Sequence, residues 1–526
     1  MSTPVKGAEL IISTLASNGV DVTFANPGTS EMHFVAALDT VPEMRGVLCL
    51  FEGVVTGAAD GYARIAGKPA ATLLHLGPGL ANGLANLHNA RRANSPVVNL
   101  VGDHATYHKR FDPPLESDIE SLASPMSAWV RRCVAQDDLV ADVESALDAA
   151  WGPPRRVATL IVPADLSWLE ATGPSLPVGK HVLPGAYTQV QPGAVESAAK
   201  ALQAPGRAAL MVGGTAARRR GLDAASRVAA ATGAKLLCET FPAALERGAG
   251  IPDVERLGYF AELAAIQLEG VTTLVLADAM SPVSFFAYPG KPSDLVPPGC
   301  AVYVLAAGAD DAPGALEALA DLVGAPQVAT GAPAARPAPP TGALSAKAVA
   351  EAVGATMPEG AIVSDESNTA GIYMAGATAG CPPHDWLCLT GGAIGQGLPV
   401  ATGAAIAAPG RRVVALEADG SAMYTLQSWW TQARESLDVT TVILENRRYA
   451  ILELELSRVG AGAAGPVAKA MLELEPPPLD FVSLARGMGV PAERAADAEE
   501  LTAMLARSFA DPGPSVIVAD VGRGIG

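Results

Sequence analysis

The sequence is short of several features that would each mark a class of protein. Its 526 residues carry 36 Lys and Arg against 54 Asp and Glu, a formal net charge of −18, so the clustered positive charge that nucleic-acid binding requires is missing. The six cysteines stand at positions 49, 133, 238, 300, 381 and 388 without a CxxC spacing, which argues against a zinc site or a disulfide framework. These absences favour an enzyme with reduced, buried thiols and no nucleic-acid partner.

Long apolar runs are missing as well. No stretch of about 18 uninterrupted apolar residues occurs, as a membrane-spanning helix would need, and residues 1–9 lack the apolar centre of a signal peptide. We therefore expect a cytoplasmic protein without a membrane partner. Hydrophobic residues make up 49% of the chain, which is typical of a compact enzyme, and the length exceeds what one core supports.

The order of apolar runs and helical stretches predicts an α/β protein with three doubly wound parallel-sheet domains. β-Branched runs alternate with amphipathic helical segments over 1–172, over 192–325 and over 345–526, the pattern of parallel sheets covered by helices. Residues 173–191 and 326–344 are rich in proline and are expected to be linkers. No internal repeat is evident.

A strand–helix–strand unit in the third segment places two oxygen side chains at one edge of its sheet. The apolar runs 413–416 and 439–444 are expected to be parallel strands, joined by a helix that Ser421 caps and that runs to about Ser436. Asp419 and Asn446 each follow one of these strands, at the edge where open α/β sheets bind ligands. An Asp, an Asn and a backbone carbonyl suffice for Mg²⁺, which takes its other ligands from phosphate and water. From the local residues alone, a turn residue and a strand breaker are an equally good interpretation.

This unit resembles the diphosphate and Mg²⁺ motif of the thiamine-diphosphate (ThDP) enzymes, in which Gly-Asp-Gly is followed at a similar distance by Asn. The resemblance implies that Asp419, Asn446 and the carbonyl of Arg448 bind the metal, while Gly420, Ser421 and Tyr449 contact the cofactor. Two departures are visible: Ala418 replaces the first Gly, and Glu445 replaces the first residue of the usual Asn-Asn pair. Both leave the ligating side chains in place.

Two further segments of the third domain resemble the same family. In AIVSDESNTAG, the resemblance places Ser367, Asn368 and Thr369 near the diphosphate. In LTGGAIGQGLPVATGAAIA (389–407), it implies that the carbonyl of Gly392 accepts a hydrogen bond from the cofactor's 4′-amino group and that Ile394 holds the cofactor bent. The alternative for the second segment is a tight helix-packing motif.

Two candidate catalytic residues lie in the first segment. Glu52 follows the apolar run 46–51 and precedes a helix, whose N-terminus it would stabilise by about 0.3–1 kcal/mol as an alternative role. The passage FEGVVTGAADGYARIAGKPA resembles the pyrimidine-binding domain of the ThDP enzymes, which implies that Glu52 is the activating glutamate. His75 ends the next strand, before an expected Gly-Pro-Gly turn at 77–79. Alone it is open to a structural interpretation, whereas the likeness to benzoylformate decarboxylase-like proteins implies proton transfer.

The resemblance spans nearly the whole chain and implies a ThDP- and Mg²⁺-dependent enzyme that acts on small 2-oxo acids. It also implies a homodimer or homotetramer with active sites at the subunit interface, because the glutamate and the metal site of one centre come from different subunits in this family. The likeness to acetolactate synthase-like proteins favours decarboxylation followed by carboligation. His75 favours the alternative, a non-ligating decarboxylase of the benzoylformate decarboxylase type. The departures at Ala418, Glu445 and Glu455 leave open a catalytically weak ThDP-binding scaffold or regulatory paralogue.

The residues expected to border the substrate are scattered along the chain: Thr29, Phe285, Phe286, Ile451 and Glu455. A carboxylate at position 455 would repel an anionic substrate unless it is paired, and a solvated helix face is an equally good interpretation. Benzoylformate-type relatives place a second His where this chain has two Phe residues.

Acetolactate synthases hold FAD against their middle domain, which raises the question of a flavin here. The Gly213-Gly214 turn is only a weak nucleotide signal, and the middle segment otherwise looks like a structural Rossmann-like domain. The stretch SPVSFFAYPGKPSD (281–294) offers no Arg to meet a diphosphate. FAD is left open but is not favoured.

Overall fold

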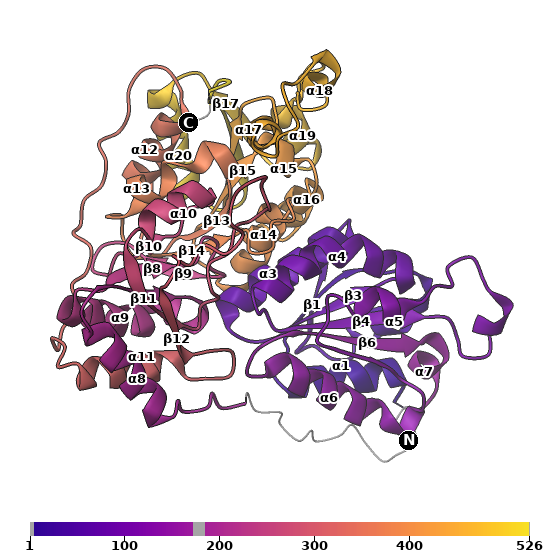
Figure 1. Cartoon of the computed structure of the whole chain (residues 1–526). Helices are drawn as coiled ribbons and strands as arrows, with labels where there is room; N and C mark the ends of the chain where they lie inside the picture. The colour runs from indigo at the N-terminus through magenta and orange to yellow at the C-terminus, as the bar shows by residue number, and fades with distance from the viewer. Residues whose placement is uncertain (1–4, 172–184, 525–526) are drawn as a thin grey trace.

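The computed structural model describes residues 5–171 and 185–524 and shows three sheets, each covered by helices (Figure 1). The sheets follow one another along the chain, and nearly all neighbouring strands within them are parallel. The predicted fold class is therefore confirmed. Residues 173–184 of the expected linker 173–191 lie outside the described residues. No helix within the described ranges is both long and apolar enough to cross a membrane.

Six parallel strands form the first sheet: β1 (Val22–Asn26), β2 (Arg45–Leu48), β3 (Ala70–Leu74), β4 (Val97–Asp103), β5 (Trp129–Arg132) and β6 (Val157–Pro163). Their order across the sheet is β2-β1-β3-β4-β6-β5. Four helices cover it: α1 (Gly7–Ser17), α3 (Glu52–Ala66), α4 (Leu76–Arg92) and α6 (Leu139–Trp151). Successive strand residues face opposite sides, so Phe24 packs in the core beneath α3 and α4, whereas Ala25 packs beneath α1 and α6.

Five strands form the second sheet: β7 (Arg207–Val212), β8 (Lys235–Cys238), β10 (Glu255–Arg256), β11 (Val271–Ala277) and β12 (Ala301–Ala306), in the order β10-β8-β7-β11-β12. The helices on one face are α8 (Pro192–Gln203), α9 (Arg219–Thr232) and α11 (Ala312–Leu322), and α10 (Ala261–Gln267) packs on the other. The apolar runs expected to be strands in this segment are therefore strands.

Seven strands form the third sheet: β13 (Ile362–Glu366), β14 (His384–Cys388), β15 (Val413–Ala418), β16 (Val439–Glu445), β17 (Ala492–Ala495), β18 (Ser515–Asp520) and the short β9 (Leu245–Arg247). β9 comes from the segment expected to form the middle domain, and it pairs antiparallel with β14 at the edge. The third sheet thus takes a strand from outside the range 345–526.

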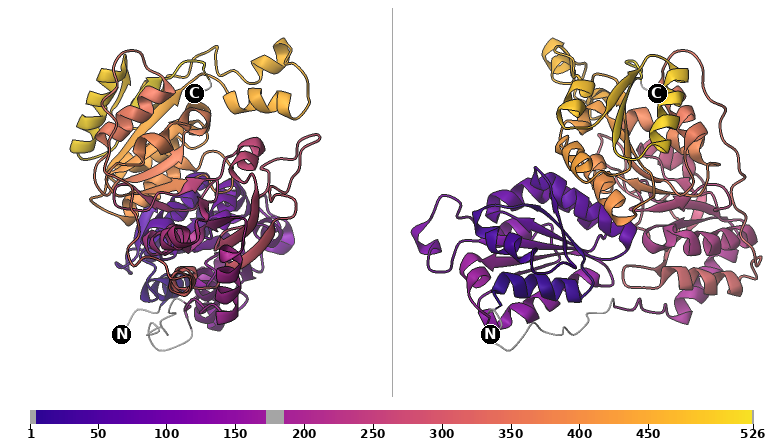
Figure 2. Two further views of the ribbon diagram at one scale, coloured as in Figure 1. Left: turned by 60° about the vertical axis from the view of Figure 1, so that its left-hand side comes forward. Right: turned by 180° about the vertical axis from the view of Figure 1, so that it is seen from behind.

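The first and third units meet along α3 and α14 (Gly397–Ala407), as Figures 1 and 2 show. Small residues allow the close approach: a Cβ at Gly57 would come within 2.6 Å of Pro399 Cβ, and Gly403 lies against the backbone of Ala58. Larger side chains at these positions would push the helices apart. This contact fixes how the carboxyl edges of the two sheets lie within one protomer.

Two local expectations are wrong. The Gly-Pro-Gly segment at 77–79 is not a turn but lies in the first turn of α4, where a proline needs no hydrogen-bonded N–H. The helix expected from Ser421 to about Ser436 is broken into α15 (Asp419–Ala422) and α16 (Gln427–Arg434). Ser421 lies inside α15 and does not cap it, because its hydroxyl donates to the carbonyl of Ala418.

Candidate active site

Glu52 lies at the carboxyl edge of the first sheet, where it begins α3. The residue is 7% exposed, and its carboxylate accepts two side-chain hydrogen bonds, from Asn26 Nδ2 at 3.2 Å and from Asn82 Nδ2 at 3.0 Å. Asn26 ends β1, and Asn82 belongs to α4. The two side-chain amides therefore orient the buried Glu52 carboxylate without bringing a positive charge to it.

His75 lies at the same edge and is held by a buried acid that the sequence did not reveal. Its Nδ1 is 2.7 Å from Glu31 Oε2, which also accepts from the N–H of Gly28 at 2.9 Å. Glu31 is fully buried, and burial raises its pKa. A Cβ at Gly28 would overlap the His75 ring. Because Nδ1 is engaged, Nε2 is the nitrogen that His75 can present to a ligand.

Glu31 belongs to a capping arrangement that could have been recognised in the sequence. Thr29 to Glu31 form a 3₁₀ turn, η1, with Gly28 at its N-cap and the Glu31 side chain bonded back to the N-cap N–H. A Glu three residues after a helix start is a known capping signal. Thr29 lies on this turn and therefore at the edge of the first sheet, away from the other expected substrate residues.

At the carboxyl edge of the third sheet, Asp419 ties the ends of β15 and β16 together. Its Oδ1 accepts from Gly420 N at 2.9 Å, and its Oδ2 accepts from Asn446 N at 3.0 Å and from Arg447 N at 2.6 Å. Burial raises the pKa of Asp419 to about 6. The parallel crossover expected from the sequence therefore does bring Asp419 and Asn446 to one edge.

The neighbouring residues complete an oxygen-rich loop. Asn446 Oδ1 accepts from Arg448 N at 3.1 Å, and Arg447 has a positive φ of 60°. The ring of Tyr449 lies so close to Gly420 that a Cβ there would be 2.5 Å from it. The side chain of Arg448 turns away to Glu453, at 2.5 Å. One carboxylate, one amide oxygen and backbone carbonyls are a donor set that suits Mg²⁺.

The two departures from the family motif leave this loop intact. Ala418 is the N-cap of α15 with φ −79° and ψ 148°, an extended conformation that any residue adopts, so glycine is not needed there. Glu445 ends β16 and accepts from Arg494 Nη1 at 2.5 Å and Nη2 at 3.2 Å. Its carboxylate forms an ion pair outside the loop.

The Gly-rich segment before α14 is held by a second buried acid that the sequence did not reveal. Glu366, the last residue of β13, accepts from Gly395 N at 2.7 Å and Gly397 N at 2.6 Å, and burial raises its pKa to about 7. From the first unit, Asn89 Nδ2 donates to the carbonyl of Ala393 at 2.8 Å. Gly392 has a positive φ of 72°, so the tight loop requires glycine at that position.

The remaining expected cofactor residues lie around this segment. Ile394 is half-buried in the loop, and Ser367, Asn368 and Thr369 follow β13 directly. The Ser367 side chain is buried and its hydroxyl donates to Asp365 at 2.6 Å. The backbone and the exposed Asn368 are therefore the parts of this segment that can meet a ligand.

Loops of the second unit cover the Gly-rich segment with aromatic rings. A Cβ at Gly392 would come within 2.6 Å of Phe285 Cζ. The ring centroid of Phe285 lies 5.0 Å from that of Phe286, in an edge-to-face contact, and 5.2 Å from that of Tyr259, in a tilted contact. The side chain of Glu455, on α17 (Ala450–Arg458), lies beside these rings. The structure therefore brings Phe285, Phe286 and Glu455 together, and Ile451 lies one turn earlier on α17.

The candidate residues form two groups in one protomer. Thr29, Glu52 and His75 lie at the edge of the first sheet, and the others lie at the edge of the third. Between described residues, no hydrogen bond or ion pair joins Glu52 or His75 to Asp419 or Asn446.

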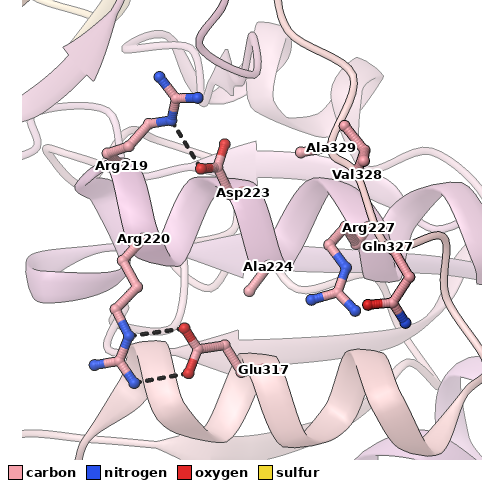
Figure 3. Close-up of a pocket in the computed structure, with 9 residues that line it drawn as sticks. All are labelled: Arg219, Arg220, Asp223, Ala224, Arg227, Glu317, Gln327, Val328 and Ala329. Atoms are coloured by element: carbon pink, nitrogen blue, oxygen red, sulfur yellow. Dashed lines mark hydrogen bonds and ion pairs between the residues drawn. The ribbon is translucent and has the colours of Figure 1, made fainter.

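Two surface hollows lie away from both edges. One, of about 310 Å³, is formed by α9, α11 and residues 327–329 (Figure 3). Its guanidinium groups are already paired: Arg219 with Asp223 at 2.7 Å, and Arg220 with Glu317 at 2.7 Å. The neutralised charges give this hollow no clear preference for an ion.

The other hollow, of about 220 Å³, includes the Gly213-Gly214 turn of the second unit. Asp278 Oδ2 accepts from both the N–H and the hydroxyl of Thr215, each at 2.8 Å. A Cβ at Gly214 would overlap the same carboxylate. The donors that a nucleotide phosphate would use at this turn are therefore occupied by the protein's own acid.

Comparisons with known proteins agree with this geometry. Residues 5–122 match the N-terminal TPP binding domain of thiamine pyrophosphate enzymes, and residues 370–519 match the C-terminal TPP binding domain. The chain is 59% identical to "Putative acetolactate synthase large subunit IlvX" of Mycobacterium tuberculosis over 98% of both chains, and 28% identical to benzoylformate decarboxylase of Pseudomonas aeruginosa over 96% of both. The solved structure of a ThDP-dependent 4-hydroxybenzoylformate decarboxylase from Rhodococcus jostii RHA1 covers 99% of the chain with a TM-score of 0.85 at 23% identity, over 100% of its own length.

Proposed function

The chain belongs to the thiamine-diphosphate enzyme family, and on that premise we propose that it is an acetolactate synthase-like enzyme that uses ThDP and Mg²⁺ to decarboxylate a 2-oxo acid and ligate the product. The observation that carries the proposal is the loop that Asp419 ties together at the carboxyl edge of the third sheet. The 59% identity to a protein named for acetolactate synthesis supports the carboligase over other members of the family.

Asp419, Asn446 and the carbonyl of Arg448 would hold Mg²⁺, which would offset the negative charge of the diphosphate beside them. Burial makes the Asp419 carboxyl hard to ionise, as the rise of its pKa to about 6 indicates, and a bound cation would favour the ionised form. The N–H of Ser421 lies in the first turn of α15, where it would suit a phosphate oxygen, whereas the N–H of Gly420 donates to Asp419 Oδ1. When bound, ThDP supplies the electron sink that a carbanion beside a carbonyl requires.

Glu52 would act on the aminopyrimidine ring through a hydrogen bond. Its two amide partners orient the carboxylate, and its burial keeps water away, so that a proton can be held at a defined atom. His75 would move a proton through Nε2, with Glu31 fixing its tautomer. Gly392 would accept through its carbonyl, and Ile394 would press on the cofactor from the same loop.

Two protomers would be needed for one site, with the Glu52 edge of one over the Asp419 edge of the other. Large apolar side chains are exposed next to both edges, which supports a covering partner. They are Met32 and Leu50 beside the first sheet, and Ile372, Met423 and Tyr424 beside the third. A second copy of the chain would bury both sets at once, giving a homodimer or a homotetramer of two such pairs.

The test is turnover of pyruvate and benzoylformate by the protein loaded with ThDP and Mg²⁺. Release of CO₂ with formation of an acetohydroxyacid supports the proposal. Release of CO₂ with an aldehyde as the only product supports the second candidate, a non-ligating decarboxylase, which the His75–Glu31 pair favours. Absence of CO₂ over a broad panel of 2-oxo acids would leave a ThDP-binding scaffold.

A further inference from the structure

One side of α4 carries asparagines that reach from the first unit toward the Gly-rich segment before α14. Asn82, Asn86 and Asn89 follow one another at four and three residues, so they lie along the same side of the helix. Asn82 orients Glu52. Asn86 is 3% exposed and Asn89 is fully buried, and buried amides of this kind require hydrogen-bond partners. Backbone groups of the Gly-rich segment are among those partners.

Asn89 binds both polar backbone atoms of Ala393. Its Nδ2 donates to the carbonyl of Ala393 at 2.8 Å, and its Oδ1 accepts from the N–H of Ala393 at 3.3 Å. Nδ2 also donates to Asn86 Oδ1 at 2.9 Å. Asn86 Nδ2 in turn donates to the carbonyl of Gly395 at 3.1 Å. Both side chains are therefore engaged in holding the segment, and Asn89 holds it from two atoms of a single residue.

The hold on Ala393 fixes the direction of a carbonyl that Asn89 does not touch. The N–H of Ala393 and the carbonyl of Gly392 belong to one trans peptide group, which is planar, so the two point in opposite directions. Because Asn89 draws the N–H toward α4, the Gly392 carbonyl points away from that helix. No described residue donates a hydrogen bond to this carbonyl, whereas the carbonyls of Ala393 and Gly395 each accept one.

Other contacts already hold the two ends of the segment. The hydroxyl of Thr390 donates to the backbone carbonyl of Asn89 at 2.8 Å, and Glu366 accepts from the N–H groups of Gly395 and Gly397. Between these ends, Gly392 has a positive φ of 72°, and glycine leaves a peptide group free to turn. The side chain of Asn89 therefore controls the peptide group that its neighbours leave unfixed.

We propose that Asn89 is a positioning residue of the reaction, which fixes the orientation in which the Gly392 carbonyl can accept a hydrogen bond from the 4′-amino group of ThDP. The inference rests on the proposed function, which assigns the aminopyrimidine ring to this segment. In a dimer built as proposed, α4 would serve both centres. Asn82 would act through Glu52 in one of them, and Asn89 would act through Gly392 in the other.

The binding test compares ThDP with 4′-deamino-ThDP, an analogue that lacks the amino group, in the presence of Mg²⁺. The wild type should bind ThDP about three- to tenfold more tightly, the effect of one neutral hydrogen bond. In Asn89→Ala the carbonyl is no longer held in place, so the two ligands should bind equally. Asn99→Ala is the matched control: Asn99 is also a fully buried asparagine, bonded to Thr72 and Thr159, but it lies in β4. It should keep the preference for ThDP.

A kinetic measurement separates positioning from stability. When saturated with ThDP, Asn89→Ala should lower kcat about ten- to a hundredfold for a 2-oxo acid that the wild type turns over, as misplacement of a reacting group by about 1 Å does. KM for that acid should change much less, and Asn99→Ala should keep both values. If Asn89→Ala fails to fold, Asn89→Ser takes its place with the same expectations, because its hydroxyl is too short to reach both atoms of Ala393.

The outcomes distinguish this inference from the proposed function. An unchanged preference for ThDP in the Asn89 variant, with CO₂ release by the wild type, overturns the inference and leaves the proposed function standing. Equal binding of ThDP and its analogue by an active wild type does the same. Loss of the preference in the Asn89 variant, with no CO₂ from any 2-oxo acid in the wild type, supports the inference and overturns the proposed function. A wild type that binds neither ligand overturns both.

Discussion

Mixing two inactive variants tests whether one active centre is built from two protomers. In Glu52→Gln, the acid that is shielded by Asn26 and Asn82 becomes a neutral amide of the same shape, so we expect normal ThDP binding and loss of most activity. In Asp419→Asn, the carboxylate that ties β15 to β16 is lost, so we expect weak Mg²⁺ and ThDP binding. Each variant alone should therefore be nearly inactive.

The geometry of a two-fold dimer sets the size of the recovery. When the two variants exchange subunits at random, about half of the dimers are mixed, and each mixed dimer has one doubly altered centre and one intact centre. Activity should therefore recover to about one quarter of the wild-type value in the unseparated mixture, and to about one half in the isolated mixed dimers. A homotetramer made of such pairs gives the same one quarter in the unseparated mixture.

The assay measures CO₂ release after co-expression of the two variants with different affinity tags, followed by isolation of the doubly tagged species. Wild type carrying both tags is the control for the tags themselves. If the mixed species stays as inactive as the single variants, each centre is built within one protomer, and the assignment of Glu52 and Asp419 to a shared interface is wrong. Full activity of Glu52→Gln alone would remove that residue from the mechanism.

Three further predictions concern stability and cofactor choice. Gly28→Ala should lower the free energy of unfolding by roughly 1–3 kcal/mol, because the new Cβ overlaps the His75 ring. Gly376→Ala is the control and should change it little, because nothing lies within 4 Å of a Cβ there. Urea denaturation of both variants checks this, and equal stabilities would contradict it. Burial raises the pKa of Glu366 from 4.5 to about 7, so the folded state binds this proton more tightly than the unfolded state does. The free energy of unfolding therefore falls as pH rises from about 4.5 to about 7. Calorimetry should show a smaller fall for Glu366→Gln, and the same pH dependence in variant and wild type would contradict the prediction. Added FAD should not raise the melting temperature, because Asp278 fills the Gly213-Gly214 turn; a clear rise would refute this.

Features that depend on the local pattern could be predicted from the sequence. The alternating apolar runs predicted the three parallel sheets. The parallel crossover between 413–416 and 439–444 predicted that Asp419 and Asn446 lie at the same sheet edge, as they do. The expected Glu52 and His75 also lie at one edge of the first sheet. Parallel strands joined by helices leave no other arrangement for residues that directly follow them.

Contacts between segments that lie far apart in sequence were decided only by the tertiary structure. The pairing of His75 with the buried Glu31, the hold of Glu366 on Gly395 and Gly397, and the contact of Phe285 with Gly392 have no periodic signal in the chain. The capture of β9 by the third sheet is of the same kind. Hydrophobic periodicity reports which face of a segment is buried, but the partner that covers it depends on how whole sheets pack. The sheet edges that carry the candidate residues could therefore be predicted from the sequence. The buried acids Glu31 and Glu366 and the contact of Phe285 with Gly392 are evident only in the folded chain.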